Sequence, residues 1–204
     1  MTPPIPLLRV AGLALALLAG LAQAGETSPA RIVSTTPSVT GILLAMDAPL
    51  VASAATTPSR LSDAKGFFTQ WAEVADQRGV QGLYKNLVFD IEAVIGQDPD
   101  LLVISATGAD SVIQHQDELN AQGVKTFVVN YSNQSWQEIA TELGRQTGLQ
   151  SQAAAAIKRF DDYTADVGAS LKVPAGSVSV VGYNIGGSYS IARRILDSSY
   201  LSVE

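Results

Sequence analysis

The sequence predicts an α/β fold in which a parallel β-sheet carries helices on both faces. Three observations lead to this prediction. Short apolar runs rich in β-branched residues alternate with stretches of helical periodicity from residue 31 to residue 148. One of these runs, LLVIS at 101–105, is apolar throughout, as is typical of a parallel strand that is buried on both sides. Each apolar run is followed by a short polar segment, as expected where a strand connects to a helix.

The first half of this region contains two expected strands and two expected helices. Residues 31–34 (RIVS) and 50–53 (LVAS) form the strands, and 39–46 (VTGILLAM) forms the helix between them. A further helix is expected at 91–97. It ends before Asp98-Pro99, because the residue that precedes a proline avoids the α conformation.

The second half continues the alternation after the strand at 101–105. A helix is expected at 110–122, ended by the glycine that follows it, and a fourth strand at 125–130 (KTFVVN). Ser135 and Glu138 have the spacing of a capping box, in which each residue satisfies a backbone N–H of the other. A helix is therefore expected from 135 to 148.

A single long helix is expected at 149–173. Its apolar residues recur every three or four positions, which places them on one stripe. At 1.5 Å per residue it would reach roughly 35 Å, longer than an ordinary domain helix. Pro174-Ala175-Gly176 would end it, and 177–181 (SVSVV) would open another strand.

The first 24 residues are expected to be a cleaved secretory signal peptide. They contain one arginine, a 13-residue apolar run and the small-residue site Ala22-Gln23-Ala24. The apolar run is shorter than the ~20 residues that span a bilayer, although an uncleaved anchor is the alternative. The chain has no cysteine, so no lipid-modified cysteine can follow the signal. The sequence predicts a periplasmic protein that is not a lipoprotein.

Charge and missing motifs exclude several classes of function. The net charge is −6, and loss of Arg9 with the signal makes it −7, which argues against nucleic acid and anionic membranes as partners. Neither GxGxxG nor GxxxxGK[ST] occurs, so the usual nucleotide cradles are missing. The only histidine, His115, lies on a polar helical face without a metal-ligand or triad pattern. No catalytic residue, metal site or cofactor is expected.

Four polar segments follow the four expected strands. They are 35–38 (TTPS), 56–60 (TTPSR), 106–110 (ATGAD) and 131–133 (YSN). In a parallel sheet with helices on both faces, ligands bind outside the carboxyl ends of the strands. The segments therefore predict a binding rim lined by hydroxyl and amide groups, with ordinary solvated turns as the alternative.

Several segments resemble the helical-backbone (class III) periplasmic binding proteins, which serve ABC importers of siderophores, haem and cobalamin. The resemblance is carried by 31–60, by GFFTQWAEVA (66–75), by IEAVIGQDPDLLVIS (91–105) with the following ATGADS, and by VVNYSNQSWQ (128–137). It implies a Rossmann-like lobe at 25–148, a long inter-lobe helix at 149–173, and the beginning of a second lobe at 174–204. Because the tail does not resemble the family's second lobe, a truncated second lobe is expected.

The resemblance also implies a function. The chain is expected to be a periplasmic solute-binding protein, and not an enzyme. It would capture a ferric catecholate siderophore of the enterobactin type as a monomer and deliver it to an ABC importer permease in the inner membrane. The truncation is expected to impair this function. Iron would enter only as part of the siderophore. The alternatives are another siderophore or cobalamin as cargo, or a small exported α/β enzyme that uses the same rim.

Individual residues take roles from the resemblance and from their chemistry. Arg60 matches a position that contacts the catecholate in the family, where a guanidinium combines charge with stacking on aromatic rings. Trp71 is expected either to stack in the cleft or to pack in the core. Glu92 matches the acid that docks on the permease. The alternative is that it is there only because a glutamate in the first turn interacts favourably with the helix dipole. The other expected ligand contacts are Thr35, Thr36, Thr57, Ser59, Thr107 and Tyr131.

Overall fold

The computed structural model describes residues 31–172, 181–183 and 189–191. The expected signal peptide at 1–24 lies outside these residues. The chain divides into two units after Asp162, and each is described by itself. The first unit contains the five-stranded sheet and most of the described helices.

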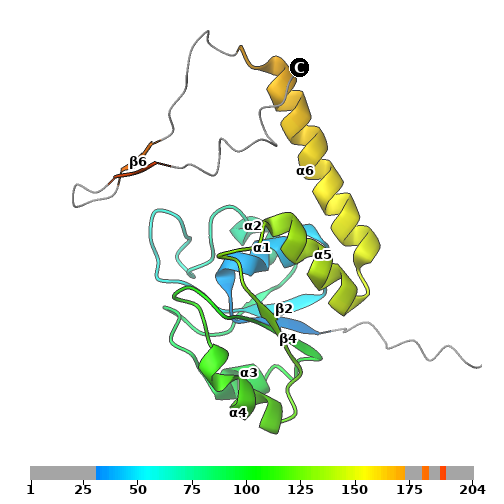
Figure 1. The fold of residues 1–204 in the computed structure, drawn as a ribbon. Coiled ribbons are helices and arrows are strands. Elements are labelled where there is room, and N and C mark those ends of the chain that lie inside the picture. Colours follow the sequence, from blue (N-terminus) through cyan, green and yellow to red (C-terminus); the bar gives the residue numbers. More distant parts are fainter. Residues whose placement is uncertain (1–30, 173–180, 184–188, 192–204) are drawn as a thin grey trace, which may run out of the picture. The chain divides into compact units, whose positions relative to one another are not determined.

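Helices and strands alternate along the first unit, as the sequence predicts (Figure 1). In chain order the elements are β1 Ile32–Ser34, α1 Pro37–Ala45, β2 Leu50–Ser53, α2 Ala72–Gln77, β3 Gln81–Gly82, α3 Ile91–Ile95, β4 Leu101–Ser105, the short 3₁₀ helix η1 Ile113–His115, α4 Gln116–Ala121, β5 Thr126–Val129, α5 Trp136–Thr147 and α6 Gln150–Ser170.

The five strands of this unit form one parallel sheet in the order β3-β2-β1-β4-β5. The central strand β1 pairs with β2 on one side, where Ile32 lies opposite Leu50, and with β4 on the other, where Ile32 lies opposite Leu101. The predicted fold class is thus confirmed. Since all strands run in one direction, the loops that follow them lie along the same edge of the sheet.

Helices cover both faces of the sheet and divide the core in two. Figure 1 shows α1, α2 and α5 on one face and α3 and α4 on the other. Strand β4 is buried along its whole length. Its alternating side chains serve both halves of the core: Leu101 packs with the first set of helices, and Leu102 and Ile104 pack with the second. This two-sided burial explains why LLVIS lacks polar alternation.

The structure differs from the sequence-based elements in two places. The helix expected at 110–122 begins later, with the 3₁₀ helix η1 at Ile113 and α4 at Gln116. Asp110 lies in the loop before it, where its carboxyl group accepts hydrogen bonds from the Thr36 and Tyr131 hydroxyls. The elements α2 and β3 were not predicted, since six and two residues are too short to show a clear period.

Helix α5 begins at the predicted capping box. The Ser135 hydroxyl accepts a hydrogen bond from the Glu138 N–H at 3.2 Å, and the Glu138 carboxylate accepts one from the Ser135 N–H at 2.7 Å. This backbone hydrogen bond lowers the pKa of Glu138. The helix ends at Gly148, whose φ of 73° is left-handed.

The predicted long helix is present as α6, which has 21 residues. Its first part packs on α5, where Ala153 lies against Gly144. Its Arg159 donates a 2.8 Å hydrogen bond to the carbonyl of Ala45 at the end of α1. None of the helices in the described residues is long and apolar enough to cross a membrane.

The second unit contains the end of α6 and a short antiparallel hairpin, β6 Val181–Tyr183 with β7 Tyr189–Ile191. Of the strand expected at 177–181, only Val181 is among the described residues. The expected role of α6 as a connector of two lobes stays a prediction.

Candidate functional site

The four polar loops meet at the carboxyl edge of the sheet and enclose a pocket of about 200 Å³. We call it the rim pocket. Its walls come from all four loops, from Phe68 before α2 and from Leu87 in the β3–α3 connection. The lining residues are Pro37, Ser38, Thr56, Phe68, Leu87, Ala109, Asp110 and Tyr131. The pocket lies where a ligand is expected in a sheet of this kind.

A carboxylate ties three of the loops together. Asp110 is only 6% exposed, and its two oxygens accept hydrogen bonds from the Thr36 hydroxyl at 2.6 Å and from the Tyr131 hydroxyl at 2.5 Å. Burial, followed by the hydrogen bond to Asp110, raises the pKa of Tyr131. In the sequence, Asp110 lies at the boundary of an expected loop and an expected helix. Nothing in the sequence indicated that its carboxylate was buried.

Gly108 allows the third loop to approach Tyr131. Its φ is +83°, and a Cβ atom built on it would lie 1.7 Å from the Tyr131 hydroxyl oxygen and 3.0 Å from Asp110 Oδ1. Any other residue would therefore be strained in its backbone and would collide with Tyr131. The glycine is required for the hydrogen bond between Tyr131 and Asp110.

Thr35 and Thr36 do not line the open rim. Both side chains are fully buried. The Thr35 hydroxyl donates to the carbonyl of Val103 at 3.4 Å, and that of Thr36 donates to Asp110. Thr35 and Thr36 follow β1, which lies between β2 and β4 in the sheet. Their hydroxyls therefore bond to neighbouring parts of the protein and not to solvent. Thr107 is half-buried, and its backbone N–H and C=O bind the Ser105 hydroxyl.

The second loop supplies the exposed part of the rim. Thr57, Ser59 and Arg60 are all exposed. The Ser59 hydroxyl accepts a hydrogen bond from the Leu61 N–H at 3.1 Å. None of the ion pairs within the described residues involves Arg60. Its guanidinium is thus available to an anion that approaches this loop.

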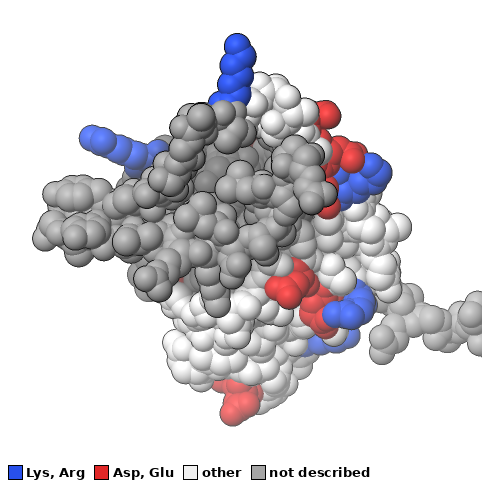
Figure 2. Space-filling model, turned by 45° about the horizontal axis from the view of Figure 1, so that its top comes forward, with Lys and Arg blue, Asp and Glu red and all other residues white. Residues whose placement is uncertain are grey.

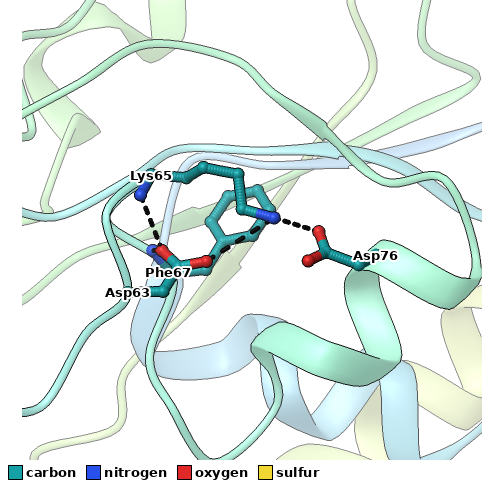
Figure 3. A network of polar contacts seen from close by, with 4 residues as sticks. All are labelled: Asp63, Lys65, Phe67 and Asp76. Carbon is teal, nitrogen blue, oxygen red and sulfur yellow. Dashed lines mark hydrogen bonds and ion pairs between the residues drawn. The ribbon is translucent and has the colours of Figure 1, made fainter.

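The turn after Arg60 is held by the network shown in Figure 3. The Asp63 carboxylate accepts hydrogen bonds from the backbone N–H groups of Lys65 and Phe67, both at 2.9 Å. The Lys65 ammonium lies between Asp63 and Asp76 and binds both. Burial opposes the ionisation of Asp63, but the two N–H donors and the nearby ammonium outweigh it, so the pKa of Asp63 is lowered.

This network makes the second loop sensitive to acid. The folded pKa of Asp63 is lower than its ordinary value of 3.8, so its ionisation stabilises the folded state fully above that value. The stabilisation is lost as the pH falls through the folded pKa. We expect Asp63→Asn to destabilise the protein by about 1 kcal/mol at pH 7 and to reduce the loss of stability between pH 4 and pH 2. Urea unfolding at each pH measures both effects.

Asp117→Asn is the matched control, because Asp117 is exposed on α4, on the other face of the sheet. It should leave the pH dependence unchanged. A wild-type acid profile in the Asp63→Asn variant would show that this carboxylate does not hold the turn.

Trp71 lies in the core and borders a second groove. It is 7% exposed and packs against Phe67 and Phe68, with ring centroids 5.0 and 6.2 Å away. The groove has a volume of about 750 Å³ and is also lined by Phe68, Trp136 and Phe160. Trp71 thus packs in the core, and its expected stacking on cargo stays a prediction.

Glu92 lies away from the rim. It is exposed in the first turn of α3, whose N-cap Asp90 accepts a 3.0 Å hydrogen bond from the Ala93 N–H. His115 is half-buried and stacks on Phe89 at 4.4 Å. No cluster of three metal-ligating side chains occurs within the described residues. On the face shown in Figure 2, acidic and basic side chains of the described residues lie interspersed.

The sequence and the fold of this chain are similar to those of known proteins. A family model described as "Periplasmic binding protein" matches residues 32–193. Over 159 residues the chain is 45% identical to the ferric enterobactin-binding periplasmic protein FepB of Escherichia coli O6:H1, covering 78% of this chain and 49% of FepB. The crystal structure of holo-ViuP is similar with a TM-score of 0.71 and 40% identity, over 81% of this chain and 54% of that one.

A more distant structure shares the fold alone. It is the FhuD fold-family protein BSU3320 of Bacillus subtilis, with a TM-score of 0.58 and 19% identity over 78% of this chain and 55% of that one. The chain thus spans about half the length of the relatives it matches. The family match covers the whole described sheet and extends beyond α6. The chain belongs to the periplasmic binding protein family.

Proposed function

We propose that this chain provides the first lobe of a periplasmic solute-binding protein for a ferric catecholate siderophore of the enterobactin type. The observation that carries the proposal is the rim pocket at the carboxyl edge of the sheet, in a chain that is 45% identical to FepB over 159 residues. FepB is named for ferric enterobactin binding. The protein binds and releases its cargo without chemical change, in keeping with a solute-binding family.

Arg60 is proposed to contact the anionic face of the cargo. A ferric tris-catecholate is a trianion, whereas the chain has a net charge of −6. Binding therefore needs a local cation. An exposed arginine can provide charge and can stack on a catecholate ring. Thr57 and Ser59 on the same exposed loop offer hydroxyl donors beside it.

Arg60→Ala is expected to weaken ferric enterobactin binding by on the order of 1–3 kcal/mol, the usual cost of losing a charged contact. Isothermal titration measures the difference. Lys125→Ala is the matched control, because exposed Lys125 precedes β5 and therefore lies at the opposite edge of the sheet. Equal affinities for Arg60→Ala and Lys125→Ala would remove Arg60 from the site.

Glu92 is proposed to dock the lobe on the permease of an ABC importer. Its position on α3, outside the rim pocket, leaves it accessible to a second protein while cargo occupies the rim. Glu92→Gln should then leave cargo affinity unchanged and reduce iron uptake by cells that depend on this protein. A loss of affinity in this variant would place Glu92 in the cargo site instead.

A further inference from the structure

The rim pocket has a chemistry that differs from that of the exposed loop beside it. Among the described residues that line it there is no lysine or arginine, and Arg60 lies outside it. Of the lining residues that the structure describes, Asp110 alone has a charged group, and four are apolar: Pro37, Phe68, Leu87 and Ala109. An anion that entered the pocket would meet a negative charge in apolar surroundings, where like charges repel strongly.

The hydrogen bonds within the pocket also disfavour an anionic ligand. The hydroxyls of Tyr131 and Thr36 each have one proton, and both donate it to Asp110. Tyr131 therefore presents only oxygen lone pairs to a ligand. The Asp110 carboxylate is likewise an acceptor. A group that carries N–H or O–H donors fits this floor better than a phenolate or carboxylate does. The hydroxyls of Ser38 and Thr56, which also line the pocket, can either donate to a ligand or accept from it.

The size of the pocket limits what can enter. About 200 Å³ accommodates one small aromatic or amide group but not an iron centre with three catecholates. The cation at Arg60 and the carboxylate at Asp110 thus divide the rim into an anion-binding part and an acceptor pocket.

We propose that the rim pocket is a subsite for an uncharged, hydrogen-bond-donating part of the cargo, and that Asp110 determines this specificity by excluding the anionic metal centre. The proposal rests on the proposed siderophore function, because it assigns different parts of one cargo to Arg60 and to the pocket. Gly108 is part of the same subsite, since it allows Tyr131 to reach Asp110.

The test uses two probes that share one ring, 2,3-dihydroxybenzamide and 2,3-dihydroxybenzoate. They differ in that the first has a neutral amide with N–H donors where the second has a carboxylate. NMR titration of the ¹⁵N-labelled chain should show tighter binding of the amide by about tenfold or more, with shifts at the Asp110 and Tyr131 loops. Equal binding, tighter binding of the benzoate, or shifts elsewhere would overturn the proposal.

Asp110→Asn keeps the shape of the side chain and removes its charge, so the preference for the amide should fall toward equality. Asp117→Asn, which removes one exposed charge on α4, should retain the full preference. An unchanged preference in Asp110→Asn would overturn the role of Asp110. If circular dichroism shows that this variant is unfolded, the test rests on the wild-type chain alone. The measured quantities are then its ratio of affinities for the two probes and the positions of its chemical-shift changes.

Ferric enterobactin itself separates this inference from the proposed function. If it fails to bind the wild-type chain while the amide is still preferred, the siderophore function is wrong and the chemistry of the pocket stands. If it binds and the two small probes do not differ, the siderophore function stands and the subsite is wrong.

Discussion

Ferric enterobactin is expected to bind the polypeptide of residues 25–204 with a dissociation constant of tens of micromolar or weaker. Well-formed sites enclose ~300–1,000 Å³ and bury ~70–90% of their ligand. The rim pocket holds only about 200 Å³, and the adjoining groove of about 750 Å³ is open to solvent, so most of a siderophore's surface would stay in water. The corresponding binding free energy is about −6 kcal/mol or less favourable. A nanomolar, two-lobed site would be tighter by three or more orders of magnitude.

The intrinsic fluorescence of Trp71 and Trp136, the two tryptophans of the chain, reports this binding through quenching by the coloured ligand. N-acetyltryptophanamide at equal absorbance controls for light absorbed by the ligand. A saturable nanomolar curve would contradict the expectation and would mean that this lobe alone is sufficient.

Gly108→Ala is expected to destabilise the first unit by about 2–5 kcal/mol. A positive φ costs an alanine roughly 1–2 kcal/mol. The new Cβ would also lie 1.7 Å from the Tyr131 hydroxyl oxygen, so the tyrosine must move and its hydrogen bond to Asp110 breaks. A forced repacking of this kind costs roughly 1–3 kcal/mol more. Urea unfolding followed by far-UV circular dichroism measures the total.

Gly123 provides the matched control within the same chain. Its φ of +84° is nearly that of Gly108, but no atom lies within 4 Å of a Cβ built on it. Gly123→Ala should therefore cost only the backbone strain, about 1–2 kcal/mol. Equal losses for the two alanine variants would show that the contact with Tyr131 does not constrain the loop.

Much of the fold could be predicted from the sequence because its strongest signals are local. LLVIS is buried on both faces, and Ser135 and Glu138 form the capping box that their spacing indicates. The elements α2 and β3 escaped prediction because they are short and depend on tertiary contacts. One such contact is the Arg78 guanidinium, which follows α2 and donates to the carbonyls of Leu44 and Ala48.

The candidate site was predictable only in outline. The order of strands and polar segments was enough to predict that four loops gather at one edge, and the structure brings them together. The direction of each side chain was not predictable. Thr36 and Asp110 are far apart in sequence, and only the pairing of β1 with β4 brings their loops together and turns the Thr36 hydroxyl inward. Whether the predicted contact residues touch cargo stays a prediction.

The strand order has a consequence for how the chain folds as it emerges, N-terminus first. Strand β1 occupies the centre of the sheet, yet one of its neighbours is β4, whose first residue is Leu101. An emerging chain that ends before Leu101 leaves one edge of β1 with open backbone groups, and such an edge readily pairs with another molecule. Contacts between distant segments also form slowly. The sheet therefore gains β4, and then β5, only late, and a chaperone that shields the emerging chain is most needed before β4 emerges.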